Sequence, residues 1–284
     1  MRSRECRRAN VTTSSEAHCS ALFCLFVLAP FASLATLRSA VLFCKALTLV
    51  RTHWPESDAV TARNRRMGVS VSGVAQFLEQ HGERKLVSVL DDGYNKVQEL
   101  DAKLSSRLRV PRSIKTTCVK PSGTVALLAG ATPGAHFPVS RFYIRRVCVD
   151  NSSPLLARLR ARGYPTEAQA AGGAGAQQSG RRVVEFPVDC GYTGRCGSDV
   201  SMEQQLHLAA LLQRHWADNQ VSCTVTFDPL TEGPRLPAAL SRFDTQLKGV
   251  SFLPQIANGA YPQMPYEEIN EAEYKRRLAN IRAE

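Results

Sequence analysis

Short apolar runs typical of β-strands alternate with segments of helical periodicity through most of this 284-residue chain. This alternation constrains the fold most strongly, because strands separated by helices favour a parallel or mixed sheet or barrel covered by helices. Strands are expected near 47–51, 114–119, 142–149, 182–188, 220–227 and 250–254, and helices near 58–80, 86–108, 152–163, 201–217, 236–247 and 270–281. The sequence therefore predicts an α/β fold, without a visible internal repeat.

Several predicted helices carry signals of their own. The segment 86–108 has one apolar stripe at spacings of three and four, formed by Leu90, Tyr94, Val97, Leu100, Leu104 and Leu108. Asp58 is the expected N-cap of a helix that runs towards Gln80, and Asn270 caps the final helix. Ser201 and Gln204 have the spacing of a capping box.

The first 45 residues differ from the rest. A basic start and a Ser/Thr patch precede the apolar run 21–37, which is short for a membrane span and contains Pro30. This segment is interpreted as a targeting peptide or a misplaced start, which leaves the domain at 46–284 with a low-complexity surface loop at 166–180. We expect a cytoplasmic protein, or an organellar one if the segment is a transit peptide, and no membrane partner.

Charge and cysteine content narrow the possible partners. The net charge of 36 − 25 = +11 attracts phosphate-bearing molecules without choosing among nucleotides, nucleic acid and lipid. The basic residues are scattered and lack interleaved aromatics, so no nucleic-acid partner is expected. The nine cysteines include no C-x-x-C pair, which gives a zinc site or a redox dithiol of that type no support.

The most site-like stretch is "TTCVKPSGTVALLAG" at 116–130, where a strand meets a turn and then a helix. Gly123 would let the backbone approach an anion, Ser122 and Thr124 would add hydroxyl donors, and the first N–H groups of the helix would point the same way. The same residues also suit an ordinary turn in which Pro121 ends the strand and Ser122 caps the helix. Taken alone, they favour that interpretation two to one. The Walker pattern G-x-x-x-x-G-K-[ST] is absent.

Other chemistry-bearing residues have structural interpretations. His136 is a lone histidine between apolar and turn residues, a setting more typical of a structural than of a catalytic role. Arg145 and Arg146 are neighbours on a predicted strand and should point to opposite faces. Glu267 and Glu268 are adjacent, and on a helix adjacent side chains do not face each other, so they are not expected to be a catalytic pair.

Five phrases in fixed order are more specific than any single motif. They are "THWPESDAVTARNRRMGVSVSG", "VPRSIKTTCVKPSGTVALLAGATPGAHFP", "RFYIRRV", "WADNQVSCTVTF" and "YPQMPYEEI". Together they strongly resemble the C-terminal part of the adenosylcobalamin-dependent, monomeric class II ribonucleoside-triphosphate reductases. The resemblance runs from about Thr48 to the end and implies the C-terminal portion of a ten-stranded α/β barrel.

The resemblance also implies an activity: reduction of ribonucleoside triphosphates to 2′-deoxyribonucleotides by a thiyl radical. It implies adenosylcobalamin as cofactor and thioredoxin or a similar dithiol as reductant. Pro121, Ser122, Gly123 and Thr124 match the family's loop for the substrate phosphates, which reverses the preference for an ordinary turn.

Two family features are missing from the sequence. No Asn-Pro-Cys-x-Glu motif is present, and no cysteine pair follows "ANIRAE", so no catalytic residue is assigned. We expect an incomplete copy of the reductase. The alternative is a non-catalytic module that binds nucleoside triphosphates.

Overall fold

The computed structural model describes residues 25–27, 34–123, 125–170, 180–255 and 263–281, with backbone alone at 25–27. Three parallel strands lie side by side in the order β1 (Leu25–Val27), β2 (Val69–Ser72) and β3 (Thr117–Cys118). A second parallel pair consists of β7 (Thr224–Phe227) and β8 (Ser251–Pro254). A parallel bridge from Val119 to Val221 joins the two groups, which gives the order β1-β2-β3-β7-β8.

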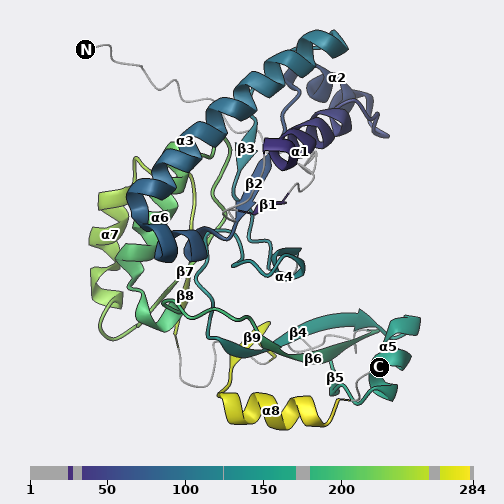
Figure 1. Cartoon of the computed structure of the whole chain (residues 1–284), viewed down its shortest axis with the longest axis vertical. Helices are drawn as coiled ribbons and strands as arrows, with labels where there is room; N and C mark the ends of the chain where they lie inside the picture. The colour runs from purple at the N-terminus through teal and green to yellow at the C-terminus, as the bar shows by residue number, and fades with distance from the viewer. Residues whose placement is uncertain (1–24, 28–33, 124, 171–179, 256–262, 282–284) are drawn as a thin grey trace.

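Helices connect and cover these parallel strands (Figure 1). They are α1 (Leu34–Leu47), α2 (Pro55–Asn64), α3 (Val74–Leu108), α6 (Met202–His215) and α7 (Leu236–Phe243). The main core lies between the strands and α1, α3 and α6, and its fully buried members include Val41, Val69, Val71, Leu86, Leu90, Val97 and Leu212. The α/β fold predicted from the alternation of elements is confirmed.

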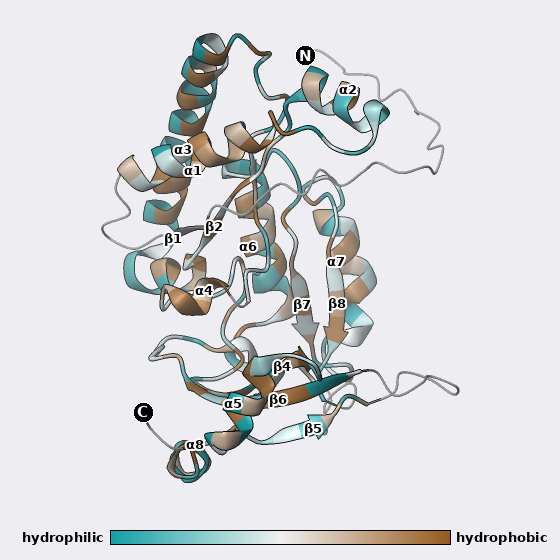
Figure 2. Cartoon of the chain, turned by 90° about the vertical axis from the view of Figure 1, so that its right-hand side faces the viewer, coloured by the Kyte–Doolittle hydropathy of each residue, from teal (hydrophilic) through white to brown (hydrophobic). Residues whose placement is uncertain are grey.

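A second, antiparallel sheet lies at one end of the molecule (Figures 1 and 2). Its strand order is β5 (Thr166–Ala168), β6 (Arg181–Asp189), β4 (Phe142–Asp150) and β9 (Tyr266–Glu268). The helices α5 (Pro154–Ala161) and α8 (Glu271–Ala279) accompany it, and α4 (Val125–Leu128) is a single turn after β3. Short 3₁₀ turns occupy Gly197–Asp199 and Gly233–Arg235.

The predicted boundary after residue 45 falls inside α1. Leu37, Val41 and Cys44 are buried in the main core, so the described part of the first 45 residues is continuous with the fold. The strand expected at 47–51 is wrong: the Thr48 N–H donates to the Lys45 carbonyl at 3.1 Å, in a turn that follows the helix. A targeting role for residues 1–24 falls outside the described residues.

The helix expected from Asp58 to Gln80 is also wrong. It is divided into α2, the strand β2 and the start of α3, because Val69 and Val71 are β-branched and all four residues of β2 are buried. Asp58 lies within α2 and accepts hydrogen bonds from the backbone N–H and the hydroxyl of Thr52. Gly82, at φ 75° and ψ 167°, breaks α3 just ahead of the predicted helix 86–108.

Most of the remaining elements agree with the sequence. The structure contains the strands predicted at 142–149 and 182–188, the capping box of Ser201 with Gln204, and the Asn270 cap. Ser153 caps α5, and its side chain accepts a hydrogen bond from the Leu155 N–H. The low-complexity loop at 166–180 begins with β5, and its residues 171–179 lie outside the described residues. None of the described helices is long and apolar enough to cross a membrane.

Candidate functional site

A large cleft separates the parallel strands from the antiparallel sheet. Its volume is about 1840 Å³, above the range typical of small-molecule pockets. Residues that follow β3, together with residues within and just after β7 and β8, line one side, and residues of β4, β6 and β9 line the other. In Figure 2, β7 and β8 point towards β4 and β6. The cleft therefore lies at the carboxyl ends of the parallel strands, where α/β proteins commonly bind ligands.

The predicted phosphate loop reaches this cleft. Pro121 and Gly123 line it, whereas Ser122 is buried, with its Oγ 2.6 Å from the Oγ of Ser72 in β2. The Ser122 hydroxyl therefore bonds inside the protein, where the sequence had suggested a donor for an anion. Thr124, the fourth predicted residue, lies outside the described residues.

The loop has an unusual backbone conformation, which hydrogen bonds to its neighbours stabilise. Ser122 has a positive φ of 48°, which a side-chain-bearing residue rarely adopts. Ser70 of β2 accepts a hydrogen bond from the Lys120 N–H at 2.9 Å, and the Ser122 carbonyl accepts one from Ala126 N–H at 2.9 Å. The N–H groups of Ser122 and Gly123 have no acceptor among the described residues. This leaves two backbone donors for a ligand.

The opposite wall contributes a group that the sequence analysis missed. The Tyr266 hydroxyl donates to the Gly123 carbonyl at 2.9 Å, and the Arg145 guanidinium lies 4.4 Å from the centre of the Tyr266 ring. Burial raises the pKa of Tyr266. "YPQMPYEEI" drew notice for its carboxylates, but no local pattern indicates that its tyrosine reaches a loop 143 residues away.

The two neighbouring arginines have different surroundings. Arg146 donates to Glu185 at 2.8 Å and also pairs with Glu267, and it shares Glu185 with Arg277. Arg145 donates from Nη1 to the Pro265 carbonyl at 3.1 Å, and its buried Nε has no partner among the described residues. Glu267 lies on the strand β9, not on a helix as the sequence suggested. Arg145 is thus the cation of this pair without a carboxylate partner among the described residues. Both arginines line the cleft, although neighbours on a strand were expected to point to opposite faces.

His136 is structural in this arrangement. Its Nε2 accepts a hydrogen bond from the Thr224 N–H at 3.0 Å, which assigns the proton to Nδ1, 3.2 Å from the Pro133 carbonyl. Burial lowers the pKa of His136, so the ring is neutral at physiological pH. Both nitrogens are engaged, which agrees with the structural interpretation of the lone histidine.

The cleft cysteines are not set up as nucleophiles. Burial raises the pKa of Cys223 to about 11 and also raises that of Cys190. Thiols in that state stay protonated at neutral pH and react poorly. Across the described parts of the chain, no group of three His, Cys, Asp or Glu side chains could hold a metal ion.

Two solved structures that share this architecture are ribonucleotide reductases. A crystal structure of a B12-dependent, class II ribonucleotide reductase matches with a TM-score of 0.73 and 30% identity, over 92% of this chain and 40% of that chain. The alpha subunit of a class Id ribonucleotide reductase from Actinobacillus ureae, at 13% identity and a TM-score of 0.55, shares the fold over 83% of this chain and 50% of that chain. The fold is therefore of the ribonucleotide reductase class.

Similar protein sequences identify a more specific class of ribonucleotide reductase. The chain is 47% identical over 251 residues to a probable adenosylcobalamin-dependent ribonucleoside-triphosphate reductase of Dictyostelium discoideum, covering 88% of this chain and 32% of that protein. It is 47% identical over 247 residues to the corresponding reductase of Euglena gracilis, covering 87% of this chain and 33% of that protein. No protein-family model matches the chain. The chain is a homologue of adenosylcobalamin-dependent ribonucleoside-triphosphate reductases and spans about a third of their length.

Proposed function

We propose that this chain is the substrate-phosphate-binding part of an adenosylcobalamin-dependent ribonucleoside-triphosphate reductase, an enzyme that reduces ribonucleotides to 2′-deoxyribonucleotides. The observation that carries the proposal is the loop at the carboxyl end of β3. It places Gly123 in the lining of the large cleft, and the N–H groups of Ser122 and Gly123 have no acceptor among the described residues. Backbone donors in that position suit the oxygens of a polyphosphate, because they need no side chain and supply no negative charge.

The five parallel strands support the finer expectation about the fold. The order β1-β2-β3-β7-β8, with helical crossovers, is what one half of a ten-stranded α/β barrel requires. The cleft then lies at the face of the barrel where the carboxyl ends of the strands meet, and the phosphate loop is part of its rim.

The cofactor is proposed from the relatives, whose names state their dependence on adenosylcobalamin. The described cleft lining does not fit a ligand role towards cobalt: both nitrogens of His136 are engaged, and the thiols of Cys190 and Cys223 are kept protonated. No residue of this chain is therefore assigned to the cofactor, and no chemical step is derived through it. Thioredoxin or a similar dithiol is the proposed reductant, and the cytoplasm or an organelle the proposed compartment.

Binding of a ribonucleoside triphosphate tests the proposal directly. We expect CTP to bind saturably, inorganic tripolyphosphate to compete with it, and cytidine to compete only weakly. Ser122→Ala should weaken binding because the contact with Ser72 holds the loop, and Thr124→Ala should weaken it if Thr124 is the ligand predicted. Ser241→Ala on the exposed side of α7 is the matched control. Equal affinity for CTP and cytidine would refute a phosphate site.

A turnover assay separates the reductase from the alternative, a non-catalytic module that binds triphosphates. The absence of an Asn-Pro-Cys-x-Glu motif favours the module for this chain taken alone. We expect no deoxyribonucleotide product from the purified chain with adenosylcobalamin and a dithiol. Product formation above the level of a cofactor-free control would show that a radical cysteine is present after all.

A further inference from the structure

One hydrogen bond connects the two walls of the cleft at the phosphate loop. Tyr266, the first residue of β9, donates its hydroxyl to the carbonyl of Gly123 at 2.9 Å. The strand β9 belongs to the antiparallel sheet, whereas Gly123 follows β3 of the parallel group. The contact therefore joins two parts of the fold that share no sheet among the described residues.

The Tyr266 ring is fixed before it reaches the loop. In the register of β4 and β9, Tyr266 pairs with Arg145, whose guanidinium stacks 4.4 Å from the ring centre. Tyr143 meets the ring edge-on, with centroids 5.5 Å apart. Backbone and side-chain hydrogen bonds to the Pro265 carbonyl, from Arg146 N–H and from Arg145 Nη1, hold the preceding residue. A hydroxyl on such a ring is preorganised, so little rotamer freedom is lost when it binds.

The same hydroxyl also leaves no room for a Cβ atom at position 123. A Cβ added to Gly123 would lie 2.6 Å from the Tyr266 oxygen but 3.7 Å from the ring carbon that carries it. The first distance is a severe overlap, and the second is ordinary van der Waals contact. The hydroxyl, and not the ring, is therefore the group that a Cβ at position 123 would overlap.

We propose that Tyr266 is a positioning residue that latches the phosphate loop through the Gly123 carbonyl. The latch fixes the peptide orientation of a loop that lines the cleft at Pro121 and Gly123 and whose Ser122 and Gly123 N–H groups have no acceptor among the described residues. Preorganised donors bind an anion better than donors that must be ordered on binding. This inference rests on the proposed triphosphate site for its consequence in binding. The latch itself is a property of the free protein.

A double-mutant cycle of Tyr266→Phe, Gly123→Ala and the pair tests the latch. Tyr266→Phe keeps the ring and its contacts with Arg145 and Tyr143, and it should weaken CTP binding roughly two- to tenfold, as expected for one hydrogen bond. Gly123→Ala should weaken binding more. In the Tyr266→Phe background the same Gly123→Ala change should cost clearly less, because the overlapping oxygen is gone. Strictly additive effects, with no rescue, would overturn the proposal.

Hydrogen exchange of the free protein tests the latch without any ligand. Amides of the segment 120–131 should exchange faster in Tyr266→Phe, while the global unfolding midpoint changes little. Tyr164→Phe is the matched control, because Tyr164 packs against Phe186 in the same sheet and its hydroxyl has no hydrogen bond to the described residues. If wild-type protein binds no CTP, the proposed function fails while the exchange data still decide the latch. Unchanged exchange in Tyr266→Phe would refute the latch even if CTP binds.

Discussion

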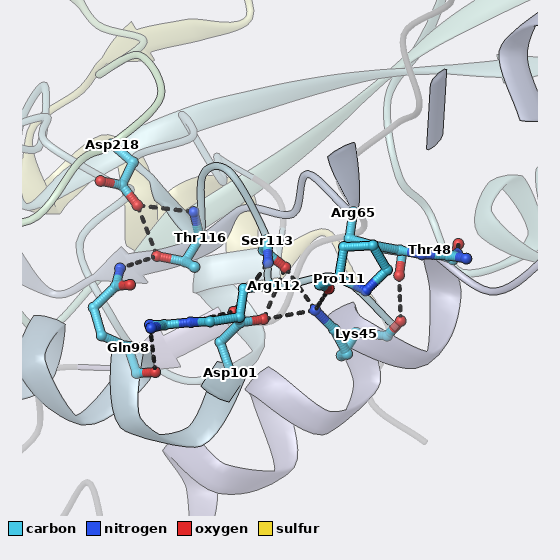
Figure 3. Close-up of polar contacts among 10 residues, drawn as sticks. All are labelled: Lys45, Thr48, Arg65, Gln98, Asp101, Pro111, Arg112, Ser113, Thr116 and Asp218. Carbon is cyan, nitrogen blue, oxygen red and sulfur yellow. Dashed lines mark hydrogen bonds and ion pairs between the residues drawn. The ribbon is translucent and has the colours of Figure 1, made fainter. Parts of the chain in front are cut away.

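The ion pair between Lys45 of α1 and Asp101 of α3 is the sharpest test of the fold. Both side chains are completely buried, with Lys45 Nζ 2.8 Å from an Asp101 oxygen. All three ammonium protons have acceptors, since the Ser113 Oγ lies at 3.0 Å and the Pro111 carbonyl at 3.2 Å. Asp101 also accepts from the Ser113 N–H at 3.0 Å. Figure 3 shows these groups converging between the two helices and the segment before β3.

Asp101→Ala removes the counter-charge and leaves the ammonium buried between two neutral acceptors. Loss of one partner of a buried pair costs about 3–5 kcal/mol, which corresponds to roughly 5–8 °C in the thermal midpoint of a chain of this size. The unfolding free energy from urea titration measures the cost. Glu99→Ala, on the exposed face of the same helix α3, is the control and should change stability little.

The cause of that cost is tested by a second substitution. Lys45→Met in the Asp101→Ala background removes the unpaired charge at nearly the same volume, so the double variant should be more stable than Asp101→Ala alone. The cavity left by Asp101 remains, so full recovery is not expected. If Lys45→Met instead destabilises the Asp101→Ala protein further, the reasoning from buried charge is wrong and packing alone explains the site.

Three further predictions concern stability. Leu90→Ala, at a completely buried position of α3, should lower the free energy of unfolding in urea by about 2–5 kcal/mol. Leu108→Ala, at a position that is 39% exposed, should lower it by less than about 1 kcal/mol. Equal losses would contradict the assigned core face of the helix. Ser201→Ala should cost about 1 kcal/mol by removing the cap of α6, and an unchanged urea midpoint would contradict this. Burial lowers the pKa of His136, so the unfolded chain binds a proton at this residue at a higher pH than the folded protein does, and the free energy of unfolding should fall as the pH drops below 6.5. His136→Gln should flatten this part of the plot of stability against pH. An identical slope in both proteins would contradict the prediction.

Local patterns in the sequence were sufficient for the features that depend on neighbouring residues. The apolar stripe of 86–108 predicted the second part of α3, in which Leu90 and Val97 are buried. The capping signals at Ser201 and Asn270 were confirmed because a cap is formed within one turn of the chain. The ordered phrases also carried the resemblance to class II reductases, which the comparisons confirm.

Features that depend on partners far along the chain were missed or misread. The β2 segment looked like part of a helix until β1 and β3 were seen to pair with it on either side. The α1 helix looked separable from the domain because its role depends on the core it covers and on Asp101, 56 residues away. Tertiary packing overrides weak local preference in such segments.

The sequence by itself determined most of the strands and helices from residue 86 onward, the caps at Ser201 and Asn270 and the position of a Gly-containing loop after a strand, because each depends on residues close in the chain. Only the tertiary structure decided that Pro121 and Gly123 face a cleft, that the Ser122 hydroxyl turns to Ser72, and that Tyr266 holds the loop. The physical reason is that these contacts join strands β2, β3 and β9, and their geometry exists only after non-local strands have been placed by burial of the core.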